Sequence, residues 1–529
     1  MLMRDPKARI RNGVLILILS IPSLYLLLSL PPLWRDSDGF NEIASTFAPK
    51  GIIHWLPVYC LGGRLIVFGG SIAGSLLSGQ GLPYLSISIT PLNDAGVYTL
   101  IIVQHIFLVY ALFCATTTFT DRYAIQVAFA ICFALTPWLY IFANCIGSEA
   151  FSNPLVILIA AHGFKCMAAP ALTRRNALLL FGLLLTAALT RQINGIFALL
   201  LPAALLPFAM RELFRGRASK NSSDGQPRFG HSKKLLVCMV AGVCAIGASI
   251  IVQQVMCWVF RVPYRSTFGE TFEWRLSYLE KLSEQQRAAT IEAVSARVGD
   301  PVVTEALEAL NRSLSEGDKW ANMFLFYKID AILLRSGFNE MQHRTWQIDL
   351  RLNRIARTVL LSGDPHFLEA VWDDFAQWPY FTQTDLAYPP FILTDWLQTQ
   401  LPIGRYGRLR GLASFRHEPG FYDNNWKQVG YFHLFAGIPI LAMAGIGAGL
   451  SGAAFLAGRR RPEIPTGVAY VFGLLVTALL VAFGNCLSTF LGARFYLPVY
   501  SVCQLAMLLG ISLAWSAYKS LKICRRSRL

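Results

Sequence analysis

The sequence has few charged residues and none of the common cofactor-binding or hydrolase motifs. Only 15% of its 529 residues are Asp, Glu, Lys or Arg, against about 25% in soluble domains, while 54% are hydrophobic. No P-loop, HExxH or GxSxG motif occurs. The mean hydropathy is +0.46. These features predict an all-α polytopic membrane protein.

Paired cysteines and internal repeats are also missing. Eleven cysteines are present, mostly inside apolar runs, and the long polar segment 261–427 contains none. Without CxxC or another paired spacing, the sequence predicts neither a disulfide framework nor a zinc site. Gly447, Gly449 and Gly452 satisfy GxGxxG, but they lie inside an apolar run with no preceding strand. We interpret them as small residues for close helix packing rather than as a dinucleotide-binding turn.

Ten apolar runs are long enough to be considered membrane spans. They lie at 13–33, 95–119, 124–143, 150–169, 176–190, 196–210, 235–260, 429–458, 466–491 and 495–518. The first has about the 20 residues that a span needs, so we do not expect it to be a cleaved signal peptide. In the first loop, the segment 63–78 and the residues around Ile43 are too short or too glycine-rich to span, and we expect interfacial helices there.

The basic residues are distributed according to the positive-inside rule. With the N-terminus placed in the cytoplasm, the cytoplasmic pieces contain 23 Lys and Arg against 5 Asp and Glu, while segment 261–427 contains 19 against 21. The net charge of +16 is therefore a topology signal and requires no nucleic-acid partner. We expect a multi-pass protein of the cell (inner or plasma) membrane with both termini cytoplasmic.

Three parts follow from this arrangement. They are an N-terminal seven-span module (1–260), an outer-face domain (261–428) and a C-terminal three-span module (429–529). The outer segment has apolar residues at helical spacing in TFEWRLSYLEKLSEQQRAATIEAV and no Gly/Ser-rich stretch. We therefore predict that it folds into a mostly helical domain.

Several polar residues are predicted to reach the same outer side of the membrane. Asp36 and Asp38 follow the first span, Glu149 begins the fourth, Arg191 lies between the fifth and sixth, and Arg494 begins the last. Considered one at a time, each residue has a purely structural explanation. The aspartates would be hydrated residues flanking a span, Glu149 a helix cap and Arg191 a side chain that extends to the membrane surface. Taken together, they supply what transfer from a lipid phosphate requires: a carboxylate base and arginines that bind phosphate bidentately.

The stretch DSDGFNEIA (36–44) resembles an acidic motif, close to D-E-x-x-Y-x-E-I-A, of the GT-C glycosyltransferases. These are polyprenyl-phosphate-sugar-dependent enzymes of the aminoarabinose-transferase and protein-mannosyltransferase type, and they carry the motif in the first outer loop. Asp36 matches the leading Asp, Phe40 the aromatic residue, and Glu42 begins the matching tail. The segment HWLPVY (54–59) and the large outer loop after the seventh span are similar to the family as well.

The sequence departs from that motif at two positions. Ser37 stands where the family has its second acid, with Asp38 displaced by one residue. Gly39 stands where the aminoarabinose branch carries Arg. Arg35 or Arg64 would then have to replace that arginine in binding phosphate.

The resemblance implies transfer of a sugar from a polyprenyl-phosphate donor to a glycan, lipid or protein acceptor at the outer face. Asp36 would deprotonate the acceptor hydroxyl, with Asp38 as the alternative base. Glu149 would position the acceptor or a divalent cation, a cofactor that the residues leave open. Arg191 and Arg494 would neutralise the leaving phosphate.

Two other functions remain open. An O-antigen-type polymerase also uses lipid-linked sugar and relies on outer-loop arginines, which GRYGRLRG (404–411) would supply. A lipid-linked-sugar flippase or transporter would place ionisable residues near the bilayer midplane on broken helices and show paired repeats. The sequence shows neither ionisable residues near the midplane on broken helices nor paired repeats.

Overall fold

The computed structural model describes residues 6–35, 37–44, 56–79, 91–218, 230–266, 268–318, 321–399, 408–409, 411–415, 417–418, 420–422, 424, 437–458, 463–489 and 493–526. Within these ranges most residues are helical, and nine helices are long and apolar enough to cross a membrane. The prediction of an all-α polytopic membrane protein is confirmed.

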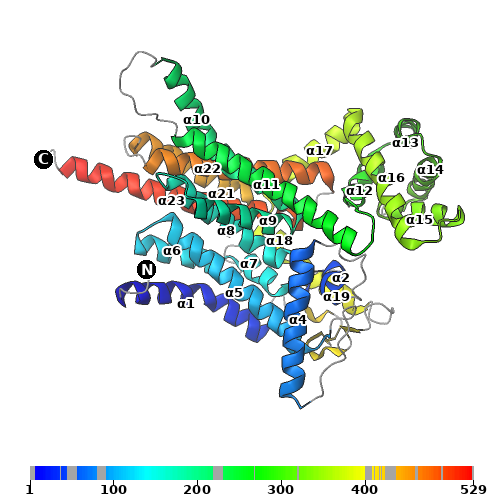
Figure 1. Ribbon diagram of the computed structural model, residues 1–529, viewed down its shortest axis with the longest axis horizontal. Coiled ribbons are helices and arrows are strands. Elements are labelled where there is room, and N and C mark those ends of the chain that lie inside the picture. The colour runs from blue at the N-terminus through cyan, green and yellow to red at the C-terminus, as the bar shows by residue number, and fades with distance from the viewer. Residues whose placement is uncertain are drawn as a thin grey trace.

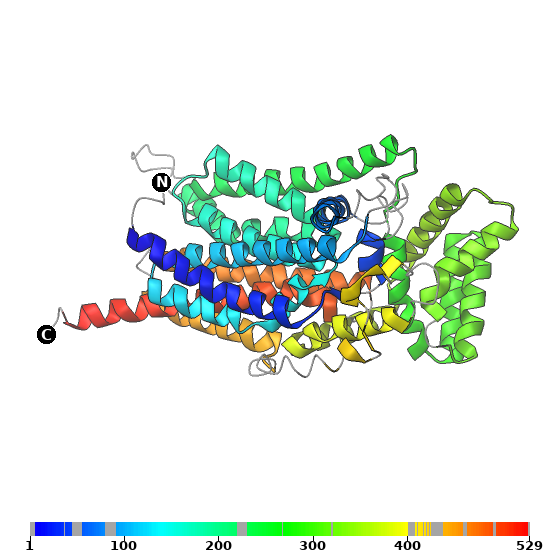
Figure 2. The same ribbon diagram turned by 90° about the horizontal axis from the view of Figure 1, so that it is seen from below.

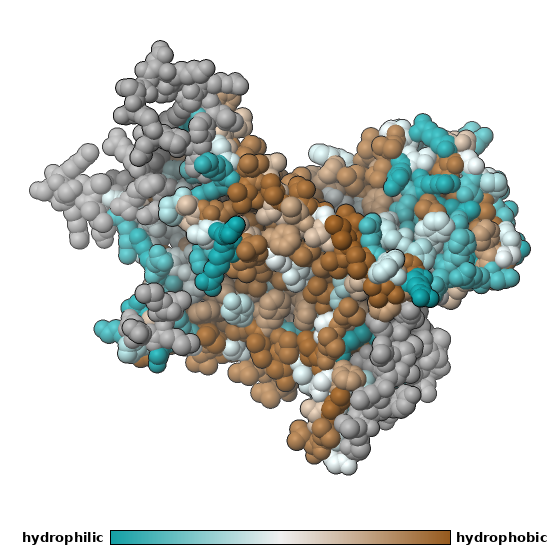
Figure 3. Space-filling view, viewed as in Figure 1, coloured by the Kyte–Doolittle hydropathy of each residue, from teal (hydrophilic) through white to brown (hydrophobic). Residues whose placement is uncertain are grey.

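The long helices run side by side as one bundle (Figures 1 and 2). They are α1 (Pro6–Ser29), α5 (Asp94–Phe119), α8 (Glu149–Ala168), α9 (Arg174–Ala188), η1 (Gln192–Leu199) continued by α10 (Leu200–Ala218), α11 (Gly230–Val259), α21 (Ile440–Gly458), α22 (Glu463–Ser488) and α23 (Leu497–Arg526). The apolar windows of α8 and α23 are 78% and 83% buried, so these two helices form the centre. Figure 3 shows the apolar band that the outer helices present.

The predicted third span, 124–143, is wrong as a continuous helix. The structure breaks it into α6 (Tyr123–Ala134) and α7 (Pro137–Ala143). Pro137 stands at the start of α7, where its missing amide hydrogen does no harm, but it cannot continue α6. Thr136, at the break, accepts a hydrogen bond from the Gln504 side chain (2.6 Å), which ties the break to α23.

The glycine-rich run in α21 packs closely on α23, as predicted for one of its glycines. A Cβ placed on Gly447 would lie 2.9 Å from backbone atoms of Ala506. Gly449 and Gly452 have open space around their Cα atoms. Close helix packing therefore depends on Gly447 in this run.

The first loop contains α2 (Ser37–Ile43) and α4 (Pro57–Leu77). The expectation that the segment 63–78 is too short or too glycine-rich to span is wrong, because α4 has 21 residues and is one of the nine helices long and apolar enough to cross a membrane. α4 nevertheless lies crosswise to the bundle in both ribbon views, which is the orientation expected of an interfacial helix (Figures 1 and 2). The segment around Ile43, expected against the bilayer, is instead inside the protein, with Ile43 0% exposed. A Cβ on Gly63 of α4 would lie 2.5 Å from the Ile43 side chain, so α2 is covered by α4.

The long polar segment is mostly helical where the structure describes it, as predicted. Its elements are α12 (Phe268–Glu273), η2 (Trp274–Lys281), α13 (Glu284–Val298), α14 (Pro301–Ser315), η3 (Ala321–Phe324), α15 (Leu325–Arg335), α16 (Met341–Ser362), α17 (Pro365–Gln377), η4 (Trp378–Tyr380), α18 (Gln383–Ala387), α19 (Pro389–Thr399) and η6 (Ala413–Phe415). We call the part from α12 to α16 the polar lobe. It projects beyond one end of the bundle, whereas α1 begins and α23 ends at the other (Figures 1 and 2).

Candidate functional site

A short parallel sheet joins the first loop to the start of α8. β1 (Leu33–Trp34) pairs with β2 (Cys145–Ile146), and the Arg35 amide continues the ladder by donating to the Ile146 carbonyl oxygen at 3.1 Å. The chain turns directly after Ile146, and α8 begins at Glu149, as the sequence predicted. The strand register therefore brings Arg35 beside Glu149.

Glu149 is the centre of a buried charge cluster formed with Arg35, Arg191 and Glu42. The Glu149 residue is 0% exposed. Arg35 Nη1 lies 3.0 Å from one Glu149 carboxylate oxygen, and Arg191 Nη1 donates to the other at 2.7 Å. Glu42 Oε1 lies 3.9 Å from Arg35 Nη1. Two arginines thus face two glutamates, and their attraction offsets the cost of removing four charges from water.

Arg191 is the member of the cluster that reaches furthest toward solvent. Its side chain is 15% exposed, against 6% for Arg35 and 1% for Glu149. Asn194, on η1, fixes the position of the turn because its side chain exchanges hydrogen bonds with the Ser152 hydroxyl of α8. The Arg191 guanidinium is therefore the group in the cluster best placed to meet an approaching anion.

Glu42 and Arg64 hold α2 in place behind the cluster. The second Glu42 oxygen accepts a hydrogen bond from the Ser148 amide at 3.1 Å. Arg64 Nε donates to the Glu42 carbonyl at 2.7 Å, and Arg64 Nη2 donates to the Asn41 carbonyl at 2.8 Å. Arg64, one of the predicted phosphate-binding residues, thus contacts backbone oxygens at the end of α2.

A neutral hydrogen-bond chain supports the turn between β2 and α8. The Tyr59 hydroxyl accepts from the Gly147 amide (2.8 Å) and donates to the Gln104 side chain (3.0 Å). Gln104 in turn donates to the carbonyl oxygens of Ala143 and Cys145 (2.9 and 3.1 Å). Tyr59 lies in the motif-like segment that the sequence indicated, whereas nothing in the sequence pointed to Gln104.

The helices after the polar lobe pack directly on the acidic stretch. Thr394 of α19 accepts a hydrogen bond from the Trp34 amide at 2.9 Å and lies 3.0 Å from the Trp34 carbonyl oxygen. The ring of Phe415 meets Trp34 edge-on, with ring centroids 6.1 Å apart. Arg408, from the run that kept the polymerase alternative open, donates to the Ala44 carbonyl. These contacts fix both ends of the segment 34–44 that contains the acidic motif.

Three of the predicted site residues lie partly or wholly outside what the structure describes. Asp36, the predicted base, is outside the described residues, as is His54 at the start of the HWLPVY segment. Asp38 lies in the first turn of α2 and Arg494 in η8 (Ala493–Tyr496), but their side chains are not described. The structure brings together Arg35, Glu149 and Arg191. The places of both aspartates and of the Arg494 side chain relative to this cluster stay predictions.

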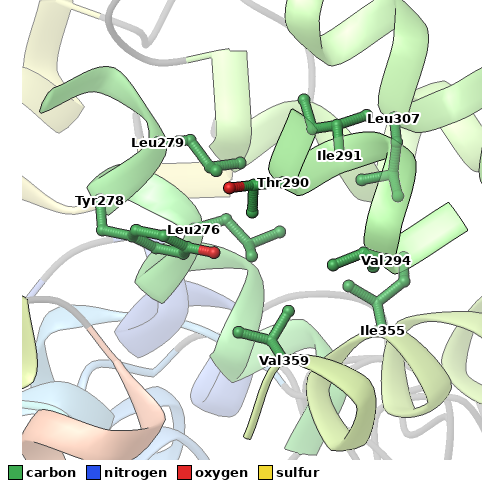
Figure 4. Close-up of a pocket in the computed structure, with 9 residues that line it drawn as sticks. All are labelled: Leu276, Tyr278, Leu279, Thr290, Ile291, Val294, Leu307, Ile355 and Val359. Atoms are coloured by element: carbon green, nitrogen blue, oxygen red, sulfur yellow. The ribbon is translucent and has the colours of Figure 1, made fainter. Parts of the chain in front are cut away.

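The described part of the chain shows neither a group of metal ligands nor, in the polar lobe, a charged recess. Within the described ranges, no three His, Cys, Asp or Glu side chains are grouped to hold a metal ion. A recess in the polar lobe is lined mainly by apolar side chains such as Leu276, Ile291 and Ile355, and Tyr278 and Thr290 are the lining residues that carry a hydroxyl group (Figure 4). Because no charged group lines it, this recess is unsuited to a phosphate-bearing substrate.

Comparison with known proteins adds no relative. No family model, curated protein or solved structure matches this chain.

Proposed function

We propose that this protein is an integral-membrane glycosyltransferase that moves a sugar from a polyprenyl-phosphate donor to a glycan, lipid or protein acceptor. One observation carries the proposal: Arg35, Glu149 and Arg191 meet in one buried cluster at the lobe end of a membrane bundle. Asp36 is the next residue after Arg35 in the chain. A base beside arginines at the membrane surface suits a lipid-linked phosphate ester.

The reaction follows from the charges of these residues. The acceptor hydroxyl oxygen attacks the anomeric carbon, and the bond from that carbon to the phosphate oxygen breaks. Asp36, or Asp38 in its place, takes the hydroxyl proton. Polyprenyl phosphate leaves with its negative charge neutralised by Arg191 and Arg494. Because the nucleophile displaces the phosphate directly, the configuration at the anomeric carbon is inverted.

Glu149 acts as a positioning residue in this scheme. Its carboxylate oxygens contact Arg35 and Arg191, so it holds both guanidiniums on one side of the site. Arg35 is the better placed substitute for the family's motif arginine, because Arg64 contacts backbone carbonyl oxygens. The outer face of the cell membrane is the proposed location of the reaction. The residues do not decide whether a divalent cation takes part.

The test compares Asp36→Asn with a matched acid at the other end of the bundle. Asp121 is exposed and precedes α6, so Asp121→Asn serves as the control. Membranes with equal protein levels receive radiolabelled polyprenyl-phosphate sugar, with and without Mg²⁺ or Mn²⁺, and donor consumption and product formation are measured. Asp36→Asn should lose about 10²–10⁴ in rate, the usual contribution of a general base, while Asp121→Asn stays at the wild-type rate.

Two results would overturn the proposal. The first is wild-type transfer in Asp36→Asn, Asp38→Asn and the double variant. The second is translocation of a fluorescent lipid-linked sugar across liposomes without cleavage of the sugar–phosphate bond, which would make the protein a flippase. Loss of activity in Asp38→Asn alone would move the role of base to Asp38.

A further inference from the structure

Helix α17 connects the polar lobe to the bundle and exposes large apolar side chains. Leu368 is 51% exposed and Trp372 is 66% exposed, and Tyr380 in the following η4 is 67% exposed. A group of large exposed apolar side chains that lie next to one another marks a surface that a partner or a membrane covers. The other side of α17 is buried, through Phe367 and Val371 among others.

The exposed surface of α17 has an apolar edge and an acidic edge. At 3.6 residues per turn, Phe375, Leu368 and Trp372 follow one another around the helix, and Glu369 and Asp373 come next. The Glu369 side chain is 72% exposed. This division is typical of helices that lie in a membrane interface, with the apolar edge in the lipid and the charged edge in water.

The apolar edge adjoins the lipid-facing surface of α22. The rings of Phe375 and Phe483 meet edge-on with centroids 5.7 Å apart. The ring centroids of Trp372 and Phe375 lie 5.9 Å apart. Phe483 lies five residues before the end of α22 and is 41% exposed, and Leu479, one turn further into the bundle, is 47% exposed. Phe375 thus contacts both Phe483 and Trp372, so the apolar edge of α17 is continuous with the side of a membrane helix.

The residues that directly follow α17 make contacts at the start of α21 and before α23, and these contacts fix the depth of α17. The Ile440 amide, at the start of α21, donates to the carbonyl oxygen of Phe381 at 3.0 Å. Trp378, directly after α17, stacks on Tyr496 before α23, with ring planes 3° apart. α17 is therefore fixed at the level where the membrane helices end, between the apolar band and the polar lobe (Figures 1 and 3).

We infer that α17 is a membrane anchor of the outer-face segment, with Leu368 and Trp372 inserted among the lipids of the adjoining leaflet. Trp at this depth is favourable because its ring is apolar and its N–H finds partners at the headgroups. The acidic edge, Glu369 and Asp373, faces water. The anchor sets the height of the polar lobe above the membrane. The assignment of α17 as an anchor rests only on the membrane character of the bundle, not on glycosyl transfer.

Photocrosslinking on the full-length protein tests this assignment. The photoreactive residue p-benzoylphenylalanine is placed at one position at a time, in nanodiscs of palmitoyl-oleoyl phosphatidylglycerol, and lipid adducts are quantified by intact mass. The apolar-edge positions are 368 and 372. The matched control on the same helix is 373, and Tyr327 on α15, which is 62% exposed, gives a second control in the polar lobe.

Lipid adducts at 368 and 372 should exceed those at 373 and 327 by at least about fivefold, because an interfacial helix buries only its apolar face. Equal adducts at all four positions, or a protein–protein adduct at 372, would overturn the inference; the latter would assign this edge to a second copy of the chain. If the substituted proteins fail to insert, brominated lipids provide a second measurement. Trp372→Phe should then lower the quenched fraction of tryptophan fluorescence, and an unchanged fraction counts against the anchor.

Discussion

Arg35 and Glu149 lie 114 residues apart and form a buried ion pair with a 3.0 Å separation. The pairing of β1 with β2 causes this contact, because each charged residue follows its strand within three positions. A shift in the register of these two short strands would move Arg35 away from the carboxylate. The cluster therefore depends on backbone contacts as much as on charge.

The close approach of α2 to β2 gives the first prediction. A Cβ at Gly39 would overlap the carbonyl oxygen of Ile146, whereas Gly62 in α4 has open space. Gly39→Ala should destabilise the protein by about 1–3 kcal/mol, the usual cost of overpacking, although alanine favours helix. Gly62→Ala should be neutral or slightly stabilising. Unfolding in detergent measures both, and equal behaviour of the two variants contradicts this account of the site.

The second prediction concerns coupling inside the charge cluster. Glu149→Gln removes the buried carboxylate that Arg35 and Arg191 both contact and should cost about 3–5 kcal/mol, as breaking a buried ion pair usually does. Adding Arg35→Gln should cost less than the sum of the single changes, with a coupling energy of about 0.5–3 kcal/mol.

An exposed ion pair provides the control for this cycle. Arg335 and Glu305 lie 2.7 Å apart, with side chains 69% and 49% exposed. The same substitutions there should give a coupling energy within about 1 kcal/mol of zero. A coupling at Arg35 and Glu149 no larger than at this surface pair would mean that the cluster is not a cooperative unit.

Much of this architecture could be predicted from the sequence because apolar runs and isolated charges have local causes. Glu149 begins α8 as expected, because an acid at the start of an apolar run marks the boundary with water and is stabilised by the helix dipole. The break of the third span also had a local signal, Pro137, which the hydropathy of its neighbours outweighed. By contrast, seven residues of α2 contain too little pattern to tell burial under protein from burial in lipid.

The internal geometry of the site could not be predicted, because it depends on long-range pairing. The Ser148 amide binds Glu42, which is 106 residues earlier in the chain. Gly147 binds the Tyr59 hydroxyl across 88 residues, and Gln104 binds the Cys145 carbonyl oxygen across 41. No local pattern marks such residues. The sequence did indicate the members of the cluster, Glu149 and Arg191 by their expected place at the outer surface and Glu42 by its motif position, but not the contacts among them.

Topology gives the third prediction, and it tests the proposed orientation. A reporter inserted near Ser222, between α10 and α11, should respond as cytoplasmic, and one after Ser315, in the polar lobe, should respond as outside, because the basic residues gather on the first side. Paired fluorescent and alkaline phosphatase fusions measure the two sites. Reporters on the same side would refute the proposed orientation together with the outer-face reaction.

The last prediction uses the buried acid Glu273 of α12. Burial, with a smaller contribution from the neighbouring Glu270, raises the pKa of Glu273 from its ordinary 4.5 to about 9, although a hydrogen bond from the Phe326 amide acts in the opposite direction. Between these pH values the folded lobe keeps a proton that the unfolded chain has released. The stability of the lobe should therefore fall as pH rises from about 4.5 toward 9.

Glu273→Gln should remove this dependence, because glutamine is neutral at every pH and its side-chain oxygen still accepts from the Phe326 amide. Hydrogen–deuterium exchange of α12 and α15 amides, measured from pH 5.5 to 8.5, should show the stability of wild type falling relative to Glu273→Gln by at least about 2 kcal/mol. The exposed Glu292 of α13 supplies the control, and Glu292→Gln should follow the wild-type curve. Parallel curves for wild type and Glu273→Gln would show that Glu273 is ionised in the folded lobe, with its charge balanced by a group or by water close to α12.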